Sequence, residues 1–453
     1  MNKSGKLVFL AIVAATPFIL GMSFPMLMTD ARVKKGVIQI EKEPNLEIHE
    51  GYVSRKEETV LVKDGRKTIA EVYLSEPVMV AMAEQEEKWG YFQFPFITRT
   101  DDNSMYISWQ MAADTYKSIG KKSIRKPLPL VSNDGGNTWI SQEVKSFGLS
   151  GNIHGVMEDG SILQIMIPKP KDINNYPNFP KSVGKSGEYS FYPMEQLPED
   201  LQGVYLNLWD NKRKSKVIHA NINDPGALRY SIDGVMPIPW SGTIRQLADR
   251  SLIAGVYPSY YLDENNEVKP CGVAFYSSLD RGYNWSVIGK IPFKADVSAK
   301  LHGSKEFDET AFEILKDSTF ICVMRSGSTA PLFKTFSYDR GNTWTKPEAF
   351  TPNGVKPKLM LLDNGVLVLV SGRPGVQIRL SLDGSGNNWT APVEMVPFMK
   401  KGSYERDVSC GYGSIIQDGP NTFCIVYSDF TTKDQYGFKR KSIWFRKVSI
   451  KLN

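Results

Sequence analysis

Cysteine and histidine are both scarce in this chain of 453 residues, which contains four of each. The cysteines form no C-x-x-C pair, and none lies at a zinc-ligand spacing from a histidine. No metal and no other cofactor is therefore expected. Cys322 and Cys424 lie inside apolar strand patterns, so buried free thiols are the expected state, with a single disulfide as the alternative.

Blocks of like charge are also absent, although the net charge is +6. The 55 basic and 49 acidic residues are scattered along the chain, so the sequence does not indicate a nucleic-acid partner. The most basic stretch, residues 439–447, is punctuated by Ile443 and Phe445. We interpret it as a strand with one solvated face.

Long apolar runs are missing except at the N-terminus. Lys3 and Lys6 precede an apolar run from Leu7 to Leu20, which is the charged-then-apolar order of an export signal. Apolar character continues to Met28, so an uncleaved membrane anchor is the alternative for residues 1–28. We expect an exported protein that is periplasmic, extracellular or surface-anchored, with no further contact with a membrane.

The pattern S-x-D-x-G-x-x-W occurs three times, at residues 132–139, 278–285 and 337–344. A fourth copy at 381–389 has one inserted residue, and residues 231–234 resemble a decayed copy that lacks the Trp. In a hairpin turn the Asp accepts backbone N–H bonds, the Gly adopts a conformation closed to other residues, and the Trp packs the turn onto the sheet. Such repetition predicts a repeat-built β fold.

A second pattern alternates with the first and occurs six times. It consists of an apolar strand, a turn that contains an Asp, and another apolar strand. The turn Asp residues lie 46 to 90 residues apart, which fits four-stranded blades of roughly 40 to 50 residues plus insertions. The predicted fold is an all-β, six-bladed β-propeller over residues 91–453 with an insertion around residues 168–240. Seven blades are the alternative. Residues 29–90 would form an N-terminal extension, for which a closing strand is one role.

Residues that open the first strand of each blade should meet at one mouth of the central channel. These positions are Gln93, His154, Thr243, Asp308 with Glu309, Lys356 with Lys358, and Tyr412. Every position is polar and several are titratable, which favours a binding or catalytic site over a set of solvated loop ends.

These repeats and segments resemble the Asp boxes and active-site segments of sialidases, over most of the chain from Phe92 onward. Glu309 opens a strand pair that ends in Arg325, as a Glu and an Arg do in that family. Arg373 lies eight residues before the repeat at Ser381, and the segment 411–415 around Tyr412 resembles the nucleophile segment.

The resemblance implies a role for each of these residues. Tyr412 would be the nucleophile, Glu309 its base and Asp114 the acid/base, while Arg325 and Arg373 would clamp an acidic group of the substrate. Each residue also has a structural interpretation as the alternative. Glu309 and Arg325 would then form a structural ion pair, Arg373 would cap a loop, Tyr412 would be a packed tyrosine and Asp114 a turn residue.

The chain departs from the family at Phe92-Gln93-Phe94-Pro95, where sialidases have Phe-Arg-Ile-Pro. An amide carries no charge and cannot replace the missing arginine of a carboxylate clamp. Gln93 therefore predicts weak or no cleavage of ordinary sialosides. His154 adds a group that the sialidase constellation lacks, either as a structural histidine or as an acid or base toward another sugar.

Three functions remain, all with a carbohydrate partner. The favoured one is an exported, exo-acting retaining glycosidase of the sialidase type, on sialic acid or another terminal acidic sugar. The second is a propeller hydrolase or lyase that uses His154 on uronic-acid-containing polysaccharides. The third is a non-catalytic carbohydrate-binding propeller. Fold alone does not choose among them.

Overall fold

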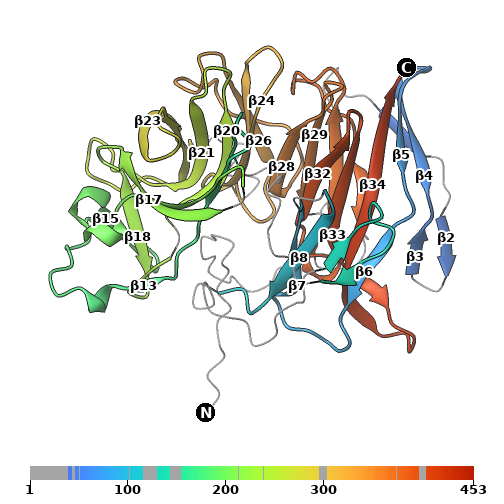
Figure 1. The fold of residues 1–453 in the computed structure, drawn as a ribbon, viewed down its shortest axis with the longest axis horizontal. Helices are drawn as coiled ribbons and strands as arrows, with labels where there is room; N and C mark the ends of the chain where they lie inside the picture. The colour runs from blue at the N-terminus through green and yellow to red at the C-terminus, as the bar shows by residue number, and fades with distance from the viewer. Residues whose placement is uncertain are drawn as a thin grey trace, which may run out of the picture.

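The computed structural model describes residues 39–42, 46–49, 52–100, 103–115, 130–142, 155–212, 214–237, 239–294, 304–373, 375–396 and 405–453. These residues form an all-β structure in which the helices are four short 3-10 turns (Figure 1). The turns are η2 (Ile173–Asn175), η3 (Met194–Gln196), η4 (Glu199–Leu201) and η5 (Glu405–Asp407). In this part of the chain, no helix has the length and apolarity needed to cross a membrane. The expected signal at residues 1–28 and His154 lie outside the described residues.

Six antiparallel units of four strands recur within the described residues. The first three are β7 (Tyr91–Arg99), β8 (Met105–Met111), β9 (Leu130–Ser132) and β10 (Ile140–Ser141); β11 (Gly155–Val156), β12 (Ile162–Ile165), β16 (Val204–Trp209) and β17 (Ser215–Asn223); and β20 (Ser241–Gln246), β21 (Leu252–Ser259), β22 (Gly272–Ser278) and β23 (Asn284–Ile291). A parallel pairing of β17 with β23 joins the second and third units into one eight-stranded sheet.

The other three units follow in chain order. They are β24 (Asp308–Ile314), β25 (Phe320–Arg325), β26 (Leu332–Ser337) and β27 (Glu348–Ala349); β28 (Val355–Leu361), β29 (Leu367–Gly372), β30 (Val376–Ser381) and β31 (Val393–Val396); and β32 (Gly413–Gly419), β33 (Thr422–Lys433) and β34 (Lys439–Leu452) with β6 (Val78–Met82). Within each unit, neighbouring strands follow one another in the chain, except that residues 166–203 separate β12 from β16 and that β6 comes from the N-terminal extension.

The N-terminal extension adds strands to the long last strand of the chain. β6 pairs with residues 442–445 of β34, and β5 (Lys67–Leu74) pairs with residues 448–452. β4 (Glu58–Asp64) and β1 (Gln39–Lys42) continue this sheet, and β2 (Leu46–His49) pairs with β3 (Tyr52–Arg55). The first and last parts of the chain are therefore held together by backbone hydrogen bonds, side by side in Figure 1.

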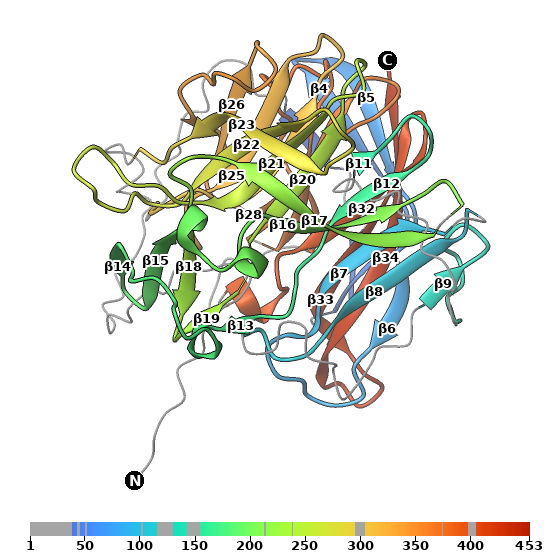
Figure 2. The same cartoon turned by 60° about the vertical axis from the view of Figure 1, so that its left-hand side comes forward.

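The segment between β12 and β20 contains a smaller sheet. Its strands are β13 (Lys171–Asp172), β14 (Gly184–Ser186), β15 (Tyr189–Pro193), β18 (Leu228–Ile232) and β19 (Val235–Met236), in the order β13-β19-β18-β15-β14. Figure 2 shows this sheet and its short helices beside the third unit. We refer to residues 168–240, apart from β16 and β17, as the insertion.

The apolar cores lie between neighbouring units. The middle strands β25, β26, β29 and β30 are buried along their whole length, because each has another sheet against both faces. One core joins Val323 of β25 to Leu367 of β29, another joins Phe275 of β22 to Phe312 of β24, and a third joins Ile107 of β8 to Val426 of β33. Continuous apolar runs are what such two-sided burial requires.

The four Ser-Asp-Gly-Trp turns connect the third and fourth strands of their units, and their hydrogen bonds repeat. In the turn after β26, Asp339 accepts from the Thr343 backbone at 2.8 Å, and Trp344 Nε1 donates to the Gly341 carbonyl at 3.1 Å. Ser337 begins this turn and pairs with Phe320, whereas the other end of β26 pairs with Arg325. The turn and Arg325 therefore lie at opposite ends of the sheet.

Replacing Gly136 by Ala should destabilise the protein more than replacing Gly65. Both have positive φ, but a Cβ at Gly136 would lie 2.1 Å from the Phe445 ring, whereas a Cβ at Gly65 would meet nothing within 4 Å. The backbone conformation costs roughly 1–2 kcal/mol in either variant, and overpacking adds roughly 1–3 kcal/mol at Gly136 alone. Thermal unfolding of the two variants tests this, and equal midpoints would contradict it.

Candidate functional site

A buried carboxylate, that of Glu309, joins three of the four-stranded units. It is 0 % exposed and accepts from Tyr412 Oη at 2.5 Å, from Arg325 Nη1 at 2.6 Å and from the Lys356 backbone at 3.1 Å. Arg325 ends β25, Lys356 lies on β28 and Tyr412 directly precedes β32. We call these four residues the Glu309 cluster. Its strands β24, β28 and β32 follow one another across the molecule (Figure 1).

Irregular backbone positions the cluster. Glu309 and Lys356 both have positive φ, at 36° and 45°, and the register shifts at these points, between Asp308 and Thr310 in β24 and between Val355 and Lys358 in β28. Such bulges re-aim side chains beside active sites. Non-glycine residues in this conformation are uncommon and strained, so their concentration here marks the cluster as a candidate functional site.

Arg373 is placed by a close approach of two backbone segments. A Cβ on Gly372 would lie 1.7 Å from the Gly411 carbonyl oxygen, so only glycine allows this contact. Arg373, at φ 49°, then lies against the segment that carries Tyr412. It is buried, and its Nε has no hydrogen-bond partner among the described residues.

The charges in the cluster move the pKa values of Glu309 and Tyr412 apart. Burial alone would raise the pKa of Glu309, but Arg325, Lys356 and the Tyr412 hydrogen bond outweigh it and hold that pKa below its usual value. Burial and the negative charge of Glu309 raise the pKa of Tyr412 well above 10, although Arg325 and Arg373 oppose this shift. The resting site is an ionised Glu309 beside a protonated Tyr412.

The pKa of Asp308 is shifted in the opposite direction to that of its neighbour Glu309. Burial raises the pKa of Asp308 well above its usual value, with the charge of Glu309 adding to the shift and Arg325 opposing it. Its Oδ1 lies 3.7 Å from Arg325 Nε and has no hydrogen-bond partner among the described residues. Two adjacent carboxyl groups therefore have pKa values that are shifted in opposite directions.

A second tyrosine contacts the cluster through Lys356. Lys356 Nζ donates to Tyr257 Oη at 2.7 Å, and Ser241 Oγ donates to the same oxygen at 3.1 Å. Lys356 Nζ also lies 6.0 Å from the centre of the Tyr412 ring. Sequence reasoning placed Lys356 at the channel mouth but did not find Tyr257, which lies near the end of β21, outside the strand openings that it compared.

Two further predicted residues, Gln93 and Asp114, are connected to this centre through their neighbours. Gln93 is 0 % exposed, and neither atom of its amide has a hydrogen-bond partner among the described residues. Its neighbour Phe94 packs against Tyr412 with ring centres 4.8 Å apart. Asp114 is buried and accepts from Trp89 Nε1 at 3.0 Å. Trp89 in turn packs against the apolar group that contains Tyr412.

The described part of the chain contains no evident set of metal ligands. No group of three or more His, Cys, Asp or Glu side chains there could hold a metal ion. All four cysteines are buried and free. What the site offers is a phenol, carboxyl groups of different pKa and several cations.

No protein-family model and no curated protein matches the sequence. Among solved structures, a protein of unknown function from Dyadobacter fermentans DSM 18053 is 17% identical with a TM-score of 0.54, covering 84% of this chain and 99% of that one. The Hadza microbial sialidase Hz136 is 16% identical (TM-score 0.46; 87% and 72% covered), and an alpha-L-arabinanase from Penicillium chrysogenum is 13% identical (TM-score 0.45; 82% and 98% covered). The first likeness extends to the fold alone, so function has to be argued from this chain's own residues.

Lys358 should make the stability of the protein depend on pH. Burial and the charge of Lys356 lower the pKa of Lys358 to about 7, whereas an unfolded lysine titrates near ~10.4. Between these values the unfolded chain holds a proton that the folded chain has released, so the contribution of Lys358 to stability rises with pH, by at most about 1.4 kcal/mol per pH unit.

Urea unfolding of wild type and Lys358→Met between about pH 7 and pH 9 measures this effect. The wild type should gain stability relative to the variant as the pH rises. A constant difference over this range would show that the amine titrates in the folded protein as it does in water.

Proposed function

We propose that this protein is an exported glycoside hydrolase that removes a terminal acidic sugar by a retaining mechanism, with Tyr412 as nucleophile. The observation that carries the proposal is the 2.5 Å hydrogen bond from Tyr412 to the buried carboxylate of Glu309, which Arg325 also contacts. A protonated phenol is a weak nucleophile, and a base within hydrogen-bond reach activates it. The resemblance of these segments to those of sialidases supports the same assignment.

In the first step, Tyr412 Oη attacks the anomeric carbon while its proton passes to Glu309 and the glycosidic C–O bond breaks. The raised pKa of Tyr412 and the lowered pKa of Glu309 oppose full ionisation of the phenol before attack. Proton transfer is therefore concerted with the attack. In the second step, water attacks the anomeric carbon, the Tyr412 oxygen leaves, and Glu309 returns the proton.

Asp114 is proposed as the acid that protonates the leaving oxygen and later accepts the proton of the attacking water. In support, Asp114 follows β8, whose last residue pairs with Tyr91 at the start of β7, next to Gln93. Its bond to Trp89 connects it to the apolar group around Tyr412. Arg325 and Arg373 are proposed to hold the acidic group of the sugar.

For residues 91–453 we propose a six-bladed β-propeller with Asp-box turns. The six four-stranded units, their face-to-face cores and the recurring Ser-Asp-Gly-Trp turns support this reading. The strand β6 would then close the last blade. Opposite placement of Arg325 and the Ser337 turn on one sheet supports a site at one mouth, away from these turns.

Tyr412→Phe should keep the fold and lose nearly all activity toward aryl glycosides, roughly a million-fold, the scale of removing a covalent nucleophile. Tyr427→Phe is the matched control, because Tyr427 is another buried tyrosine, on β33, outside the cluster. Sugar release from a panel of acidic aryl glycosides measures the effect. Wild-type turnover by Tyr412→Phe would exclude the covalent mechanism.

Ordinary sialosides should be poor substrates, and Gln93→Arg should improve binding of a sialic acid analogue about tenfold, the scale of one charge-assisted contact. The space occupied by the unpartnered Gln93 amide would then hold a third guanidinium. Inhibition by the analogue is compared in wild type, Gln93→Arg and the uncharged Gln93→Met. Efficient turnover of sialosides by wild type would show that two arginines suffice.

A further inference from the structure

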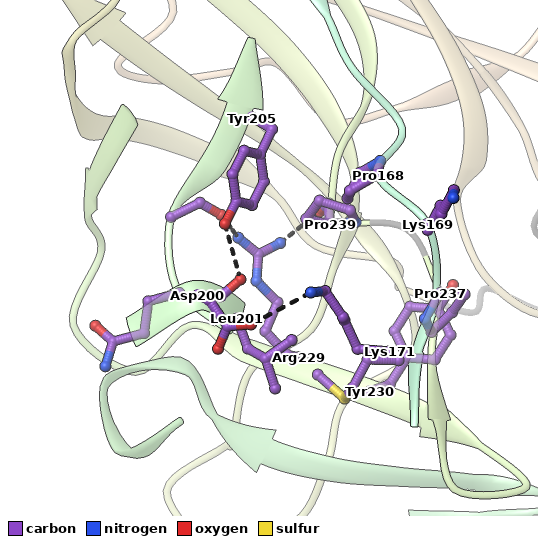
Figure 3. A pocket seen from close by; sticks show the side chains of 13 residues that line it. Pro168, Lys169, Lys171, Asp200, Leu201, Tyr205, Arg229, Tyr230, Pro237 and Pro239 are labelled. Carbon is purple, nitrogen blue, oxygen red and sulfur yellow. Dashed lines mark hydrogen bonds and ion pairs between the residues drawn. The ribbon is translucent and has the colours of Figure 1, made fainter. Parts of the chain in front are cut away.

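A cavity of about 280 Å³ lies beside the insertion and is lined by none of the four residues of the Glu309 cluster (Figure 3). Its volume is close to the lower end of small-ligand pockets, roughly 300–1,000 Å³. Leu201, Met236 and three prolines form apolar walls, and the rings of Tyr205 and Tyr230 complete them. The mixture of flat apolar walls and a few charges is typical of a binding pocket.

Arg229 is the buried cation of this cavity. It is 8 % exposed, and two of its nitrogens are fixed by backbone carbonyls, Nη1 by Pro239 at 2.5 Å and Nη2 by Gly203 at 2.6 Å. Its Nε has no hydrogen-bond partner among the described residues, and none of their carboxylates forms an ion pair with it. The charge of Asp224 acts on Arg229 from further away, but this carboxylate is paired with Lys290 at 2.7 Å. Burial lowers the pKa of Arg229 to about 10, so the group stays charged at neutral pH. A buried charge with no counter-ion in direct contact is unfavourable, which points to an anionic ligand.

The other charges around the cavity leave an excess of positive charge. The lining residues include Lys169, Lys171 and Arg229 but only one carboxylate, Asp200. Asp200 Oδ2 lies 3.5 Å from Lys171 Nζ and accepts from Tyr176 at 2.7 Å, so its charge is offset locally. Figure 3 shows Lys171 and Asp200 paired on one side of the Arg229 guanidinium. Arg229 and Lys169 are left for a ligand.

A short path connects the cavity to the Glu309 cluster. Pro239 lines the cavity, and Ser241, two residues further on, donates to Tyr257 Oη. The same oxygen accepts from Lys356, whose backbone binds Glu309. Tyr257 is buried, so this path is a chain of contacts inside the protein that links the two regions.

We infer that this cavity binds an anionic saccharide unit, a sugar that carries a carboxylate or a sulfate, through Arg229 and Lys169. The guanidinium contacts the anionic group, and the tyrosine and proline walls pack against the sugar ring. That this unit belongs to the glycan hydrolysed at the Glu309 cluster rests on the proposed function, whereas binding at the cavity does not depend on hydrolysis.

Calorimetric titration of the full chain carrying Tyr412→Phe tests the inference without turnover. The probes are methyl glucuronide, glucose 6-sulfate and the neutral methyl glucoside. At least one anionic probe should bind about tenfold or more tightly than the neutral one, the scale of a charge-assisted contact. The tighter of the two anionic probes identifies the acidic group.

Arg229→Met and Lys169→Gln, each added to this background, should weaken that binding, by about tenfold for Arg229. Lys169 is exposed, so its variant stays informative if Arg229→Met fails to fold. Lys185→Gln, an exposed lysine on β14 that does not line the cavity, is the matched control. Arg373→Gln reports on binding at the Glu309 cluster and should leave the cavity unaffected.

Three results would overturn the inference: no saturable binding of either anionic probe, equal binding of the neutral probe, or binding that Arg373→Gln weakens while Arg229→Met and Lys169→Gln do not. The proposed function is judged separately, by hydrolysis of aryl glycosides by the wild type and its loss in Tyr412→Phe. Either claim can therefore fail while the other stands.

Discussion

The arrangement of the site depends on one desolvated carboxylate, that of Glu309. Removing such a charge from water costs several kcal/mol, and three donors from three neighbouring units offset this cost. Each donor has to arrive at a set position, which couples the packing of β24, β28 and β32 to the geometry of the site. The same carboxylate keeps Arg325 paired and fixes the hydroxyl of Tyr412. Removing the Glu309 carboxylate would leave the buried Arg325 guanidinium without its closest counter-ion. Such a change would disturb both the packing of the strands and the geometry of the candidate site.

The backbone around Glu309 is strained, and regular sheets on both sides hold it. Phe92, Phe94, Glu309, Lys356 and Arg373 all adopt positive φ without being glycine, and each such residue costs on the order of 1–3 kcal/mol. Glu309 and Lys356 lie on β24 and β28, which pair with the fully buried strands β25 and β29. Their burial supplies the stability that keeps the strained ends in place. The candidate site therefore lies where the sheets end, at the side opposite the Ser337 turn.

Much of this could be predicted from the sequence because it depends on local patterns. The repeated turns and apolar runs predicted an all-β, repeat-built chain, and the spacing of Glu309, Arg325 and Tyr412 led to residues that the structure brings together. The bulges could not be predicted, since the residues at positive φ are Phe, Glu, Lys and Arg, for which local propensity indicates ordinary strand. Tyr257 was missed for a related reason: it reaches the cluster through the Lys356 side chain rather than from a strand opening. The Arg229 cavity depends on contacts between β16, β18 and the start of β20, which no local pattern encodes.

Buried cations lie in two regions, the Glu309 cluster and the Arg229 cavity. These regions are linked by the contacts of Tyr257 with Ser241 and Lys356. Arg325 is neutralised by Glu309, whereas Arg373 and Arg229 each keep an Nε without a hydrogen-bond partner in the described residues. A folded protein tolerates such groups poorly unless a ligand or water satisfies them, and they are costlier to retain than neutral residues of similar volume. Under the proposed function and the inferred cavity ligand, acidic groups of the glycan would satisfy Arg373 at the cluster and Arg229 in the cavity. The proposal makes the uncharged Gln93 part of the specificity: fewer cations at the cluster and additional ones in the insertion would favour a glycan with more than one acidic group over a single strongly held acidic sugar.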